Sequence, residues 1–281
     1  RKGGAGGKHR KHTMPDPHRL QPGQPFRIAD CDTRATRFHQ NKKAAEKEFL
    51  KLRDELIEWQ CRLYAEGQQR LLIVLQAMDA GGKDGTIRKV FQGVNPQGVQ
   101  ITSFKTPTAH ELAHDFLWRI HQQVPARGMI RVFNRSHYED LLIVRVDRLV
   151  PEQVWRARFE QINQFERLLA ESGTRILKFF LHISREEQRE RFQERIDDPL
   201  KHWKFSLDDL AKRRQWDGYM AAYEEALFQC STEWAPWHLI PADQNWYRNL
   251  AVLRSIVAAL REMNPEYPPP HSEFEGLTVD A

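Results

Sequence analysis

Arg70-Leu-Leu-Ile-Val-Leu75 runs directly into Gln76-Ala-Met-Asp-Ala-Gly-Gly-Lys-Asp-Gly-Thr86, and this stretch decides the fold. Its first part is a short, continuous apolar run, which is typical of a parallel strand that is buried on both faces. Its second part is a Gly-rich turn, after which a helix is predicted from about Asp84 to Gln92. A strand, a Gly-rich turn and a helix, in that order, form the context that a phosphate-binding loop requires.

The residues of this turn suit an anion. Gly81 and Gly82 allow the backbone to direct several N–H groups inward, and the next helix presents its positive N-terminus to the same point. Lys83 adds a mobile ammonium group. We therefore expect phosphate to be bound by the turn and the start of the helix, through Ala80, Gly81, Gly82, Lys83, Asp84, Gly85, Thr86 and Arg88.

The turn matches the pattern G-x-x-x-x-G-K-[ST] imperfectly. Ala77 stands in place of the first Gly, and Asp84 in place of the Ser or Thr that binds Mg²⁺. A plain Gly-rich turn with an exposed Lys83 is therefore the alternative. Asp79 favours the phosphate site, because a carboxylate among anion-binding amides repels phosphate unless a cation or a proton transfer needs it. We expect Asp79 to be a metal ligand or a base, with helix capping as the alternative.

Strands alternate with helices along the rest of the chain. Further strands are predicted over residues 99–104, 128–133, 175–183 and 237–240, and helices over residues 36–65, 108–120, 138–146, 151–172, 184–196, 206–229 and 246–263. The helix that starts at the capping box Thr108-Ala-His-Glu111 is expected to carry Leu112, Phe116 and Ile120 on one face. This alternation predicts an α/β fold, in which a mostly parallel sheet has helices on both faces. A single domain is expected over residues 31–264.

The charge of the chain is concentrated at one end. The 281 residues carry a net charge of +5, and residues 1–12 alone hold five Lys or Arg and no acid. A disordered basic tail is predicted over residues 1–30, with a basic arm for nucleic acid or an acidic polymer as the alternative. Residues 265–281 form a C-terminal tail with little periodicity. The rest of the chain is near neutral, so binding to nucleic acid is not expected.

No apolar run approaches the ~20 residues that a membrane span needs. The three Cys are scattered and form neither a disulfide framework nor a metal-binding pair. This usage favours a reducing compartment. The sequence therefore predicts a cytoplasmic protein without a membrane partner.

A second polar segment, Phe133-Asn-Arg-Ser-His-Tyr-Glu-Asp140, follows the third predicted strand. In open α/β sheets, ligands collect beyond the carboxyl ends of the strands. Arg135 can bind phosphate there through two parallel hydrogen bonds. Glu139 and Asp140 could hold Mg²⁺, or Asp140 could simply pair with Arg145. His137 is expected to be a hydrogen-bonded structural histidine rather than a catalytic base.

The third segment, residues 185–214, holds nine Lys or Arg and eight acids. A pair of solvated helices with ion pairs four residues apart is one interpretation. The other is a hinged lid, because Asp197-Asp-Pro199 interrupts the helix and Arg191 and Arg195 share one helical face. Lids that carry arginines stabilise a phosphoryl group in transfer and exclude water.

Together these stretches resemble the polyphosphate kinase 2 family. The matching segments are Met78–Thr86, Ser103–Thr108, Phe133–Asp140, Lys178–Ser184, Trp203–Ser206 and Asn245–Arg248. The resemblance spans about residues 71–260. It implies a P-loop kinase-like three-layer sandwich with a helical lid at about 185–214. It also implies a Mg²⁺-dependent transferase that moves phosphoryl groups reversibly between inorganic polyphosphate and nucleoside mono- or diphosphates. An ATP-dependent nucleotide kinase or ATPase, and a non-catalytic binding module, are the alternatives.

The resemblance also assigns residues. Catalysis is expected from Asp79, Lys83 and Arg135, and polyphosphate binding by the lid from Arg191, Arg195, Lys201 and Lys204. Nucleotide binding is expected from Lys105, Asn134, Arg135, Ser136 and Glu139, and metal binding from Asp79, Glu139 and Asp140. Asn134 stands where the family often has Asp. The sequences of residues 133–140 and of His114–His121 resemble those of class III members, which act on both nucleoside mono- and diphosphates. A homo-oligomer, either a dimer or a tetramer, is expected.

Overall fold

The computed structural model describes residues 16–279, and a five-stranded sheet lies at their centre. The strands are β1 (Arg70–Ala77), β2 (Val99–Ser103), β3 (Ile130–Asn134), β4 (Thr174–His182) and β5 (Trp237–Pro241). They lie in the order β2-β3-β1-β4-β5, and all neighbours are parallel. Every residue of β1 except Arg70 is buried, as its continuous apolar sequence predicts for the central strand of a parallel sheet.

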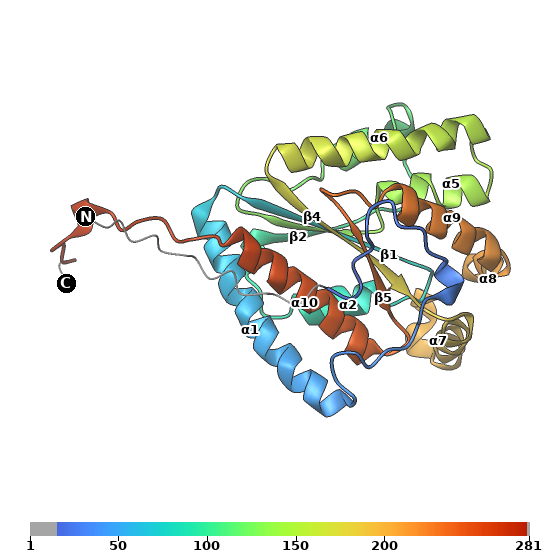
Figure 1. Ribbon diagram of the computed structural model, residues 1–281, viewed down its shortest axis with the longest axis horizontal. Coiled ribbons are helices and arrows are strands. Elements are labelled where there is room, and N and C mark those ends of the chain that lie inside the picture. The colour runs from blue at the N-terminus through green and yellow to red at the C-terminus, as the bar shows by residue number, and fades with distance from the viewer. Residues whose placement is uncertain (1–15, 280–281) are drawn as a thin grey trace, which may run out of the picture.

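Helices cover both faces of the sheet, which gives three layers (Figure 1). One face carries α1 (Lys42–Glu66), α2 (Lys83–Val90) and α10 (Asn245–Met263). The other carries α5 (Ile143–Val146), α6 (Glu152–Glu171) and α9 (Trp216–Gln229). The predicted α/β class with a parallel sheet is confirmed.

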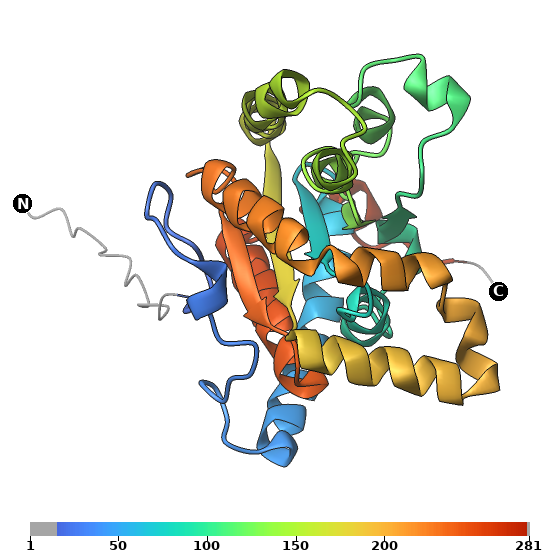
Figure 2. The same ribbon diagram turned by 90° about the vertical axis from the view of Figure 1, so that its right-hand side faces the viewer.

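The lid predicted at about residues 185–214 forms a helical hairpin of its own. Helix α7 (Arg185–Asp197) leaves the end of β4, the short helix η4 (Pro199–Lys204) turns the chain, and α8 (Leu207–Arg214) returns toward the sheet. Figure 2 shows this hairpin projecting beyond the sheet. The expected break at Asp198-Pro199 is present, since the Asp198 side chain accepts a hydrogen bond from the N–H of Leu200.

Four predicted helices differ from the structure, and one of them, over residues 206–229, is divided into α8 and α9. The helix predicted from residue 36 begins at Lys42, because Asn41 caps it. The helix predicted from residue 108 is two single turns, α3 (Ala109–Leu112) and α4 (Trp118–His121), and Leu112 is 69% exposed. The Asp115 carboxylate accepts a hydrogen bond from the N–H of Leu117 (3.0 Å), and this local bond competes with a continuous helix.

The region predicted as one helix over residues 138–146 also divides. It consists of the 3-10 helix η3 (His137–Asp140) followed by α5. Two other 3-10 helices, η1 (Ile28–Asp30) and η2 (Pro96–Gly98), lie in connecting segments, and η5 (Ser272–Phe274) lies in the C-terminal segment.

The predicted disordered tail over residues 1–30 is wrong for its second half. The main chain of residues 18–20 runs antiparallel to the outer edge of β5, where the N–H of Leu20 donates to Trp237 O and the N–H of Leu239 donates to His18 O, both at 2.8 Å. Ile28 is buried in the core. Residues 16–30 therefore belong to the domain, and the expectation for the basic residues 1–12 lies outside the described part of the chain.

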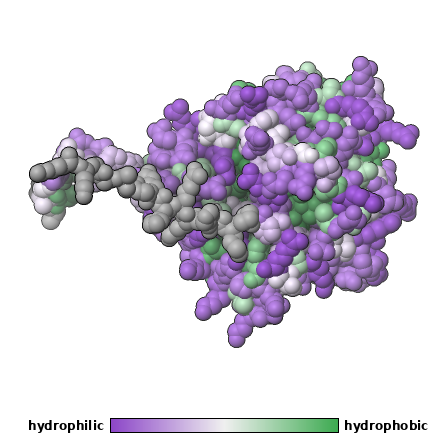
Figure 3. All heavy atoms as spheres, in the orientation of Figure 1, coloured by the Kyte–Doolittle hydropathy of each residue, from purple (hydrophilic) through white to green (hydrophobic). Residues whose placement is uncertain are grey.

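Hydrophilic residues dominate the face of the molecule seen in Figure 3, and apolar residues form small groups between them. Between residues 16 and 279, no helix combines the length and the apolar character that crossing a bilayer requires. The segment after α10 is largely exposed and extends away from the body of the domain (Figure 1).

Candidate active site

The Gly-rich turn lies at the carboxyl end of the central strand β1. Ala80 and Gly82 have positive φ angles of 62° and 97°. A Cβ atom on Gly81 would lie 2.4 Å from Ala77 Cβ and 2.8 Å from Met78 O. Only glycine fits at Gly81, and Gly82 adopts a conformation that costs other residues energy. The turn ends at Gly82, and α2 begins with Lys83.

Lys83 folds back onto the turn. Its Nζ donates a hydrogen bond to Ala77 O at 3.1 Å. Burial and the neighbouring Arg135 guanidinium lower the pKa of Lys83 to about 8, although nearby carboxylates such as Asp79 oppose this shift. The ammonium group is thus held inside the loop without a direct carboxylate partner in the described chain. Phosphate oxygens are the ligands that would compensate such a charge.

Asp79 joins the loop to β3 and to the lid. Its Oδ1 accepts a hydrogen bond from Arg135 Nη2 at 2.8 Å, and its Oδ2 lies 3.8 Å from Lys212 Nζ on α8. From α7, Gln188 Nε2 donates to the main-chain oxygen of Asp79 at 2.9 Å. The alternative role of Asp79 as a helix cap is wrong, since Gly82 is the residue before α2 and no side chain caps this helix.

The end of β3 brings three predicted residues to the same edge. Arg135 has a positive φ of 64°, and its side chain reaches Asp79. Asn134 Nδ2 donates to Asp84 Oδ1 at 2.6 Å. Ser136 is fully buried and caps η3 through its hydroxyl. The structure therefore brings residues of the second segment next to the phosphate loop, as the parallel sheet predicts.

A small pocket lies between the loop and the lid. Its lining includes Asp79, Arg135 and Glu139 from the core of the domain, and Lys212 and Tyr219 from the lid side. Its volume is about 20 Å³, little more than one water molecule needs. Lys212 of α8 therefore lies beside Asp79 and Arg135 at the carboxyl end of the sheet.

The predicted metal set of Asp79, Glu139 and Asp140 is not brought together. Asp140 lies 2.6 Å from Arg158 Nη1 in a separate pocket, and burial raises its pKa to about 6. The alternative pairing with Arg145 is also wrong, because Arg145 binds Glu225. Over the described range, residues 16–279, no group of three or more His, Cys, Asp or Glu side chains could hold a metal.

The lid residues predicted to bind polyphosphate make contacts with the protein itself. Arg191 donates from Nη1 to Ala80 O and from Nη2 to Ala242 O, both at 2.8 Å, and pairs with Glu187. Arg195 donates to Lys204 O at 3.0 Å. Arg191 thus ties α7 to the phosphate loop.

Other predicted residues lie farther from the pocket. Arg88 and Lys105 are exposed, and Lys105 lines a separate groove of about 510 Å³ beside β2. Lys201 pairs with Asp198 (3.2 Å), and the ammonium of Lys204 lies 4.8 Å from the centre of the Trp203 ring. Their proposed contacts with substrate stay predictions.

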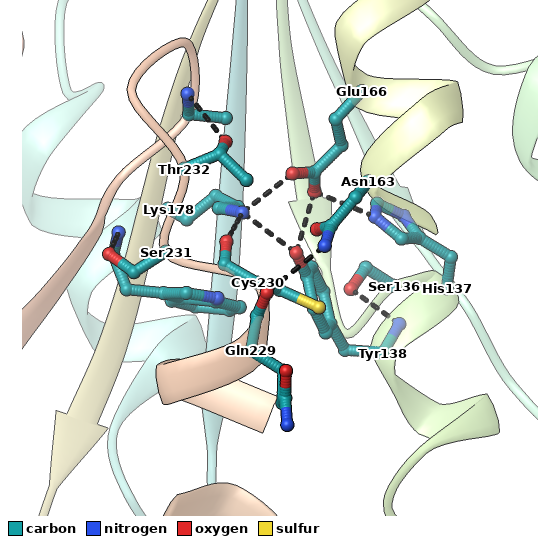
Figure 4. A network of polar contacts seen from close by, with 12 residues as sticks. Ser136, His137, Tyr138, Asn163, Glu166, Lys178, Gln229, Cys230, Ser231 and Thr232 are labelled. Atoms are coloured by element: carbon teal, nitrogen blue, oxygen red, sulfur yellow. Dashed lines mark hydrogen bonds and ion pairs between the residues drawn. The ribbon is translucent and has the colours of Figure 1, made fainter. Parts of the chain in front are cut away.

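A buried polar network lies next to the segment that follows the carboxyl end of β3 (Figure 4). Lys178 Nζ donates to Tyr138 Oη (2.7 Å), Glu166 Oε2 (2.6 Å) and Cys230 O (2.7 Å). His137 Nε2 lies 3.0 Å from Glu166 Oε1, and both side chains are fully buried. The prediction of a structural role for His137 is confirmed. Lys178 stood in a segment that resembles the family and beside apolar residues of the strand, but the sequence did not indicate its partners.

Sequence reasoning also missed the roles of three residues that border the loop. They are Gln188 and Lys212 from the lid and Arg248 from α10. All three lie inside segments described above, but no pattern in the sequence indicated what each side chain would touch.

A Gly-rich loop at the end of the central parallel strand, a lysine within it and a helical lid above it define a P-loop kinase, an enzyme that transfers phosphoryl groups. A family model described as polyphosphate kinase 2 (PPK2) matches residues 39–268. The chain belongs to the polyphosphate kinase 2 family.

Relatives support this membership over nearly the whole chain. It is 53% identical to an AMP/ADP-polyphosphate phosphotransferase of Meiothermus ruber, over 94% of this chain and 99% of the relative. It is 44% identical to an ADP-polyphosphate phosphotransferase of Rhodopseudomonas palustris, over 89% and 91% of the two chains. The crystal structure of polyphosphate kinase 2 from Arthrobacter aurescens TC1 superposes with a TM-score of 0.87 at 43% identity, over 93% and 92% of the chains.

Proposed function

We propose that this protein transfers phosphoryl groups between inorganic polyphosphate and both AMP and ADP, which yields ADP and ATP. The observation that carries the proposal is the meeting of Lys83, Arg135 and the lid residue Lys212 around the carboxylate of Asp79. The Meiothermus ruber relative, which is named for both acceptors, supports the use of AMP as well as ADP. The Rhodopseudomonas palustris relative is named for ADP alone, so AMP is the acceptor that most needs a test.

The chain's own residues account for most of the chemistry. Lys83 and the loop N–H groups bind phosphate oxygens, and Arg135 neutralises charge on the group in transfer. The acceptor phosphate is already an anion at neutral pH, so no strong base is needed. Positioning and charge neutralisation supply the rate. The pocket between the loop and α8 has a volume of only about 20 Å³, so the proposal includes a movement of the lid that admits substrates and then excludes water.

The proposal includes Mg²⁺ as cofactor, and two carboxylates suit it. Asp79 and Glu139 line the same pocket, and Mg²⁺ is usually held by one or two protein carboxylates together with substrate phosphates and water. When bound, the ion would neutralise phosphate charge. Asp140 is not part of this set, because Arg158 holds it elsewhere. Asn134, an amide bonded to Asp84, is a weaker candidate.

Several finer expectations stay predictions. They concern polyphosphate binding by Arg195, Lys201 and Lys204, nucleotide binding by Lys105, Asn134, Arg135, Ser136 and Glu139, a homo-oligomeric state, a cytoplasmic location, and the lack of nucleic-acid and membrane partners.

The test is a donor and acceptor panel. Purified protein is incubated with polyphosphate, Mg²⁺ and either AMP or ADP, and nucleotide products are separated by chromatography. We expect ADP and then ATP from AMP, and ATP from ADP. Turnover with ADP but not with AMP would restrict the proposal to diphosphates. Turnover with ATP as the donor, and none with polyphosphate, would refute it in favour of an ordinary nucleotide kinase.

A further inference from the structure

A buried arginine lies behind the phosphate loop. Arg248 belongs to α10 and is 2% exposed. Its Nε donates to Thr86 Oγ1 at 2.7 Å, its Nη1 to Asn245 Oδ1 at 2.7 Å, and its Nη2 to Asn249 Oδ1 at 3.1 Å. All three acceptors are neutral oxygen atoms. The guanidinium is hydrogen-bonded on every nitrogen, but these bonds supply no negative charge.

The surroundings of Arg248 leave this charge uncompensated. Across the described residues, no carboxylate oxygen lies within 4.0 Å of its guanidinium. A second cation shares one of its acceptors, because Arg191 Nη2 of the lid lies 3.4 Å from the same Asn245 Oδ1. Glu187 is engaged with Arg191 at 2.9 Å. Burial and the Arg191 charge lower the pKa of Arg248 to about 9, with Glu187 opposing. A buried charge without a partner is costly to a folded protein.

The guanidinium also packs directly against the loop backbone. A Cβ atom on Gly82 would lie 2.0 Å from Arg248 Nη1 and 2.5 Å from its Cζ. A Cβ atom on Gly85, one turn into α2, would lie 3.5 Å from Nη2. The two glycines therefore form the surface on which Arg248 rests. The guanidinium of Arg248 thus lies directly against the backbone of the phosphate loop.

We propose that Arg248 is a positioning residue for the phosphate loop, and that the bound phosphate chain supplies the counter-charge that the protein lacks. Its guanidinium holds the Gly82 turn in place and adds a fixed positive charge from behind. The proposal rests on the proposed function only in taking a phosphate chain as the ligand. The free protein bears the cost of the buried charge, and phosphate binding relieves it.

The consequence is a link between ligand binding and stability. Replacement of Arg248 by a neutral residue removes the buried charge that destabilises the free protein. It also removes the attraction between this charge and the bound phosphate chain. At an effective dielectric constant of about 20, a unit charge about 12 Å from the bound phosphate is worth roughly tenfold in affinity. We therefore expect the KM for polyphosphate to rise roughly tenfold while kcat changes little, because the charge acts on the bound chain before and during transfer alike.

The experiment compares Arg248→Gln with Arg248→Lys. Both variants keep a hydrogen-bond donor, but only lysine keeps the charge. Thermal unfolding is measured with and without tripolyphosphate, and KM and kcat are measured with polyphosphate. We expect Arg248→Lys to keep most of the ligand-induced rise in unfolding temperature and Arg248→Gln to lose most of it. If Arg248→Gln does not fold, Arg248→Met takes its place, because methionine removes the buried charge and adds no polar atom of its own.

Arg261→Met is the matched control. Arg261 lies on the same helix, is about half exposed and pairs with Glu55 at the surface, so its loss changes net charge equally but far from the loop. It should leave the ligand-induced rise unchanged. An equal response of the Lys and Gln variants to tripolyphosphate would overturn the inference and leave the proposed function standing. Failure of tripolyphosphate to stabilise the wild-type protein would overturn both.

Discussion

Replacement of Lys178 by methionine tests the buried network under the active site. The Lys178 ammonium and the Glu166 carboxylate lie 2.6 Å apart, and neither side chain is exposed. Methionine fills a similar space but leaves the carboxylate buried without its cation. Breaking one partner of a buried pair costs about 3–5 kcal/mol. At about 2–4 °C per kcal/mol for a domain of this size, the unfolding temperature at pH 7 should fall by roughly 6–20 °C.

The pH dependence gives this prediction a sign. Burial opposes the charge on Glu166, but Lys178 and His137 outweigh it, so the pKa of Glu166 lies below its usual 4.5. In the wild-type protein the Glu166 carboxylate therefore contributes stability above its unfolded-state pKa, and this stability is lost as the pH falls. In Lys178→Met, burial acts without Lys178 and raises the pKa of Glu166, so the variant loses stability as the pH rises through about 4.5. The difference in unfolding temperature between the wild-type protein and Lys178→Met should therefore become smaller below about pH 4.5.

Two further variants complete the test by calorimetry or circular dichroism. The double variant Lys178→Met/Glu166→Gln carries no buried charge pair and should recover much of the loss. Arg167→Met, on the same helix α6 but in an exposed pair with Glu171, should cost less than about 1 kcal/mol. Equal unfolding temperatures for Lys178→Met and Arg167→Met would refute the reasoning.

Three predictions concern turnover. Lys83→Met should lower kcat by about 10²–10³ (roughly 3–4 kcal/mol) without lowering the unfolding temperature; wild-type activity would show that the loop is not the active site. In the free enzyme the pKa of Lys83 is about 8, so kcat/KM for polyphosphate should fall above about pH 8 as the ammonium loses its proton, and a flat profile to about pH 10 would contradict this. Asp79→Asn should abolish transfer but keep or strengthen polyphosphate binding, because it frees Arg135 and Lys212; normal turnover with weak binding would make Asp79 structural.

The parallel sheet could be predicted from sequence because the strands at its centre, such as β1, are short and largely apolar and are separated by helical segments. The loop could be predicted because a strand, a Gly-rich turn and a helix follow one another within the chain. The single turns α3 and α4 could not, since apolar spacing there resembles a longer helix until Asp115 bonds to the backbone.

Contacts between side chains that are far apart in the sequence could not be predicted. Arg191 donates hydrogen bonds to the main-chain oxygens of Ala80 and Ala242. Every residue has such an oxygen, so the sequence does not indicate which ones an arginine will contact. Asp140 pairs with Arg158 rather than with Arg145, a choice that depends on how α6 packs. A charged residue in an apolar strand, such as Lys178, signals a buried partner but does not say which one.

The antiparallel segment on β5 has a consequence for how the chain reaches its native state. His18 and Tyr247, which are joined by a 2.9 Å hydrogen bond, are 229 residues apart in the chain, so the first described segment docks on an element that is synthesised 229 residues later. Contacts of such long separation form slowly, because the loop between them has to close first. The outer edge of β5 is therefore covered only once nearly the whole domain exists, and a nascent chain that stops short of β5 leaves residues 18–20 without a strand to pair with.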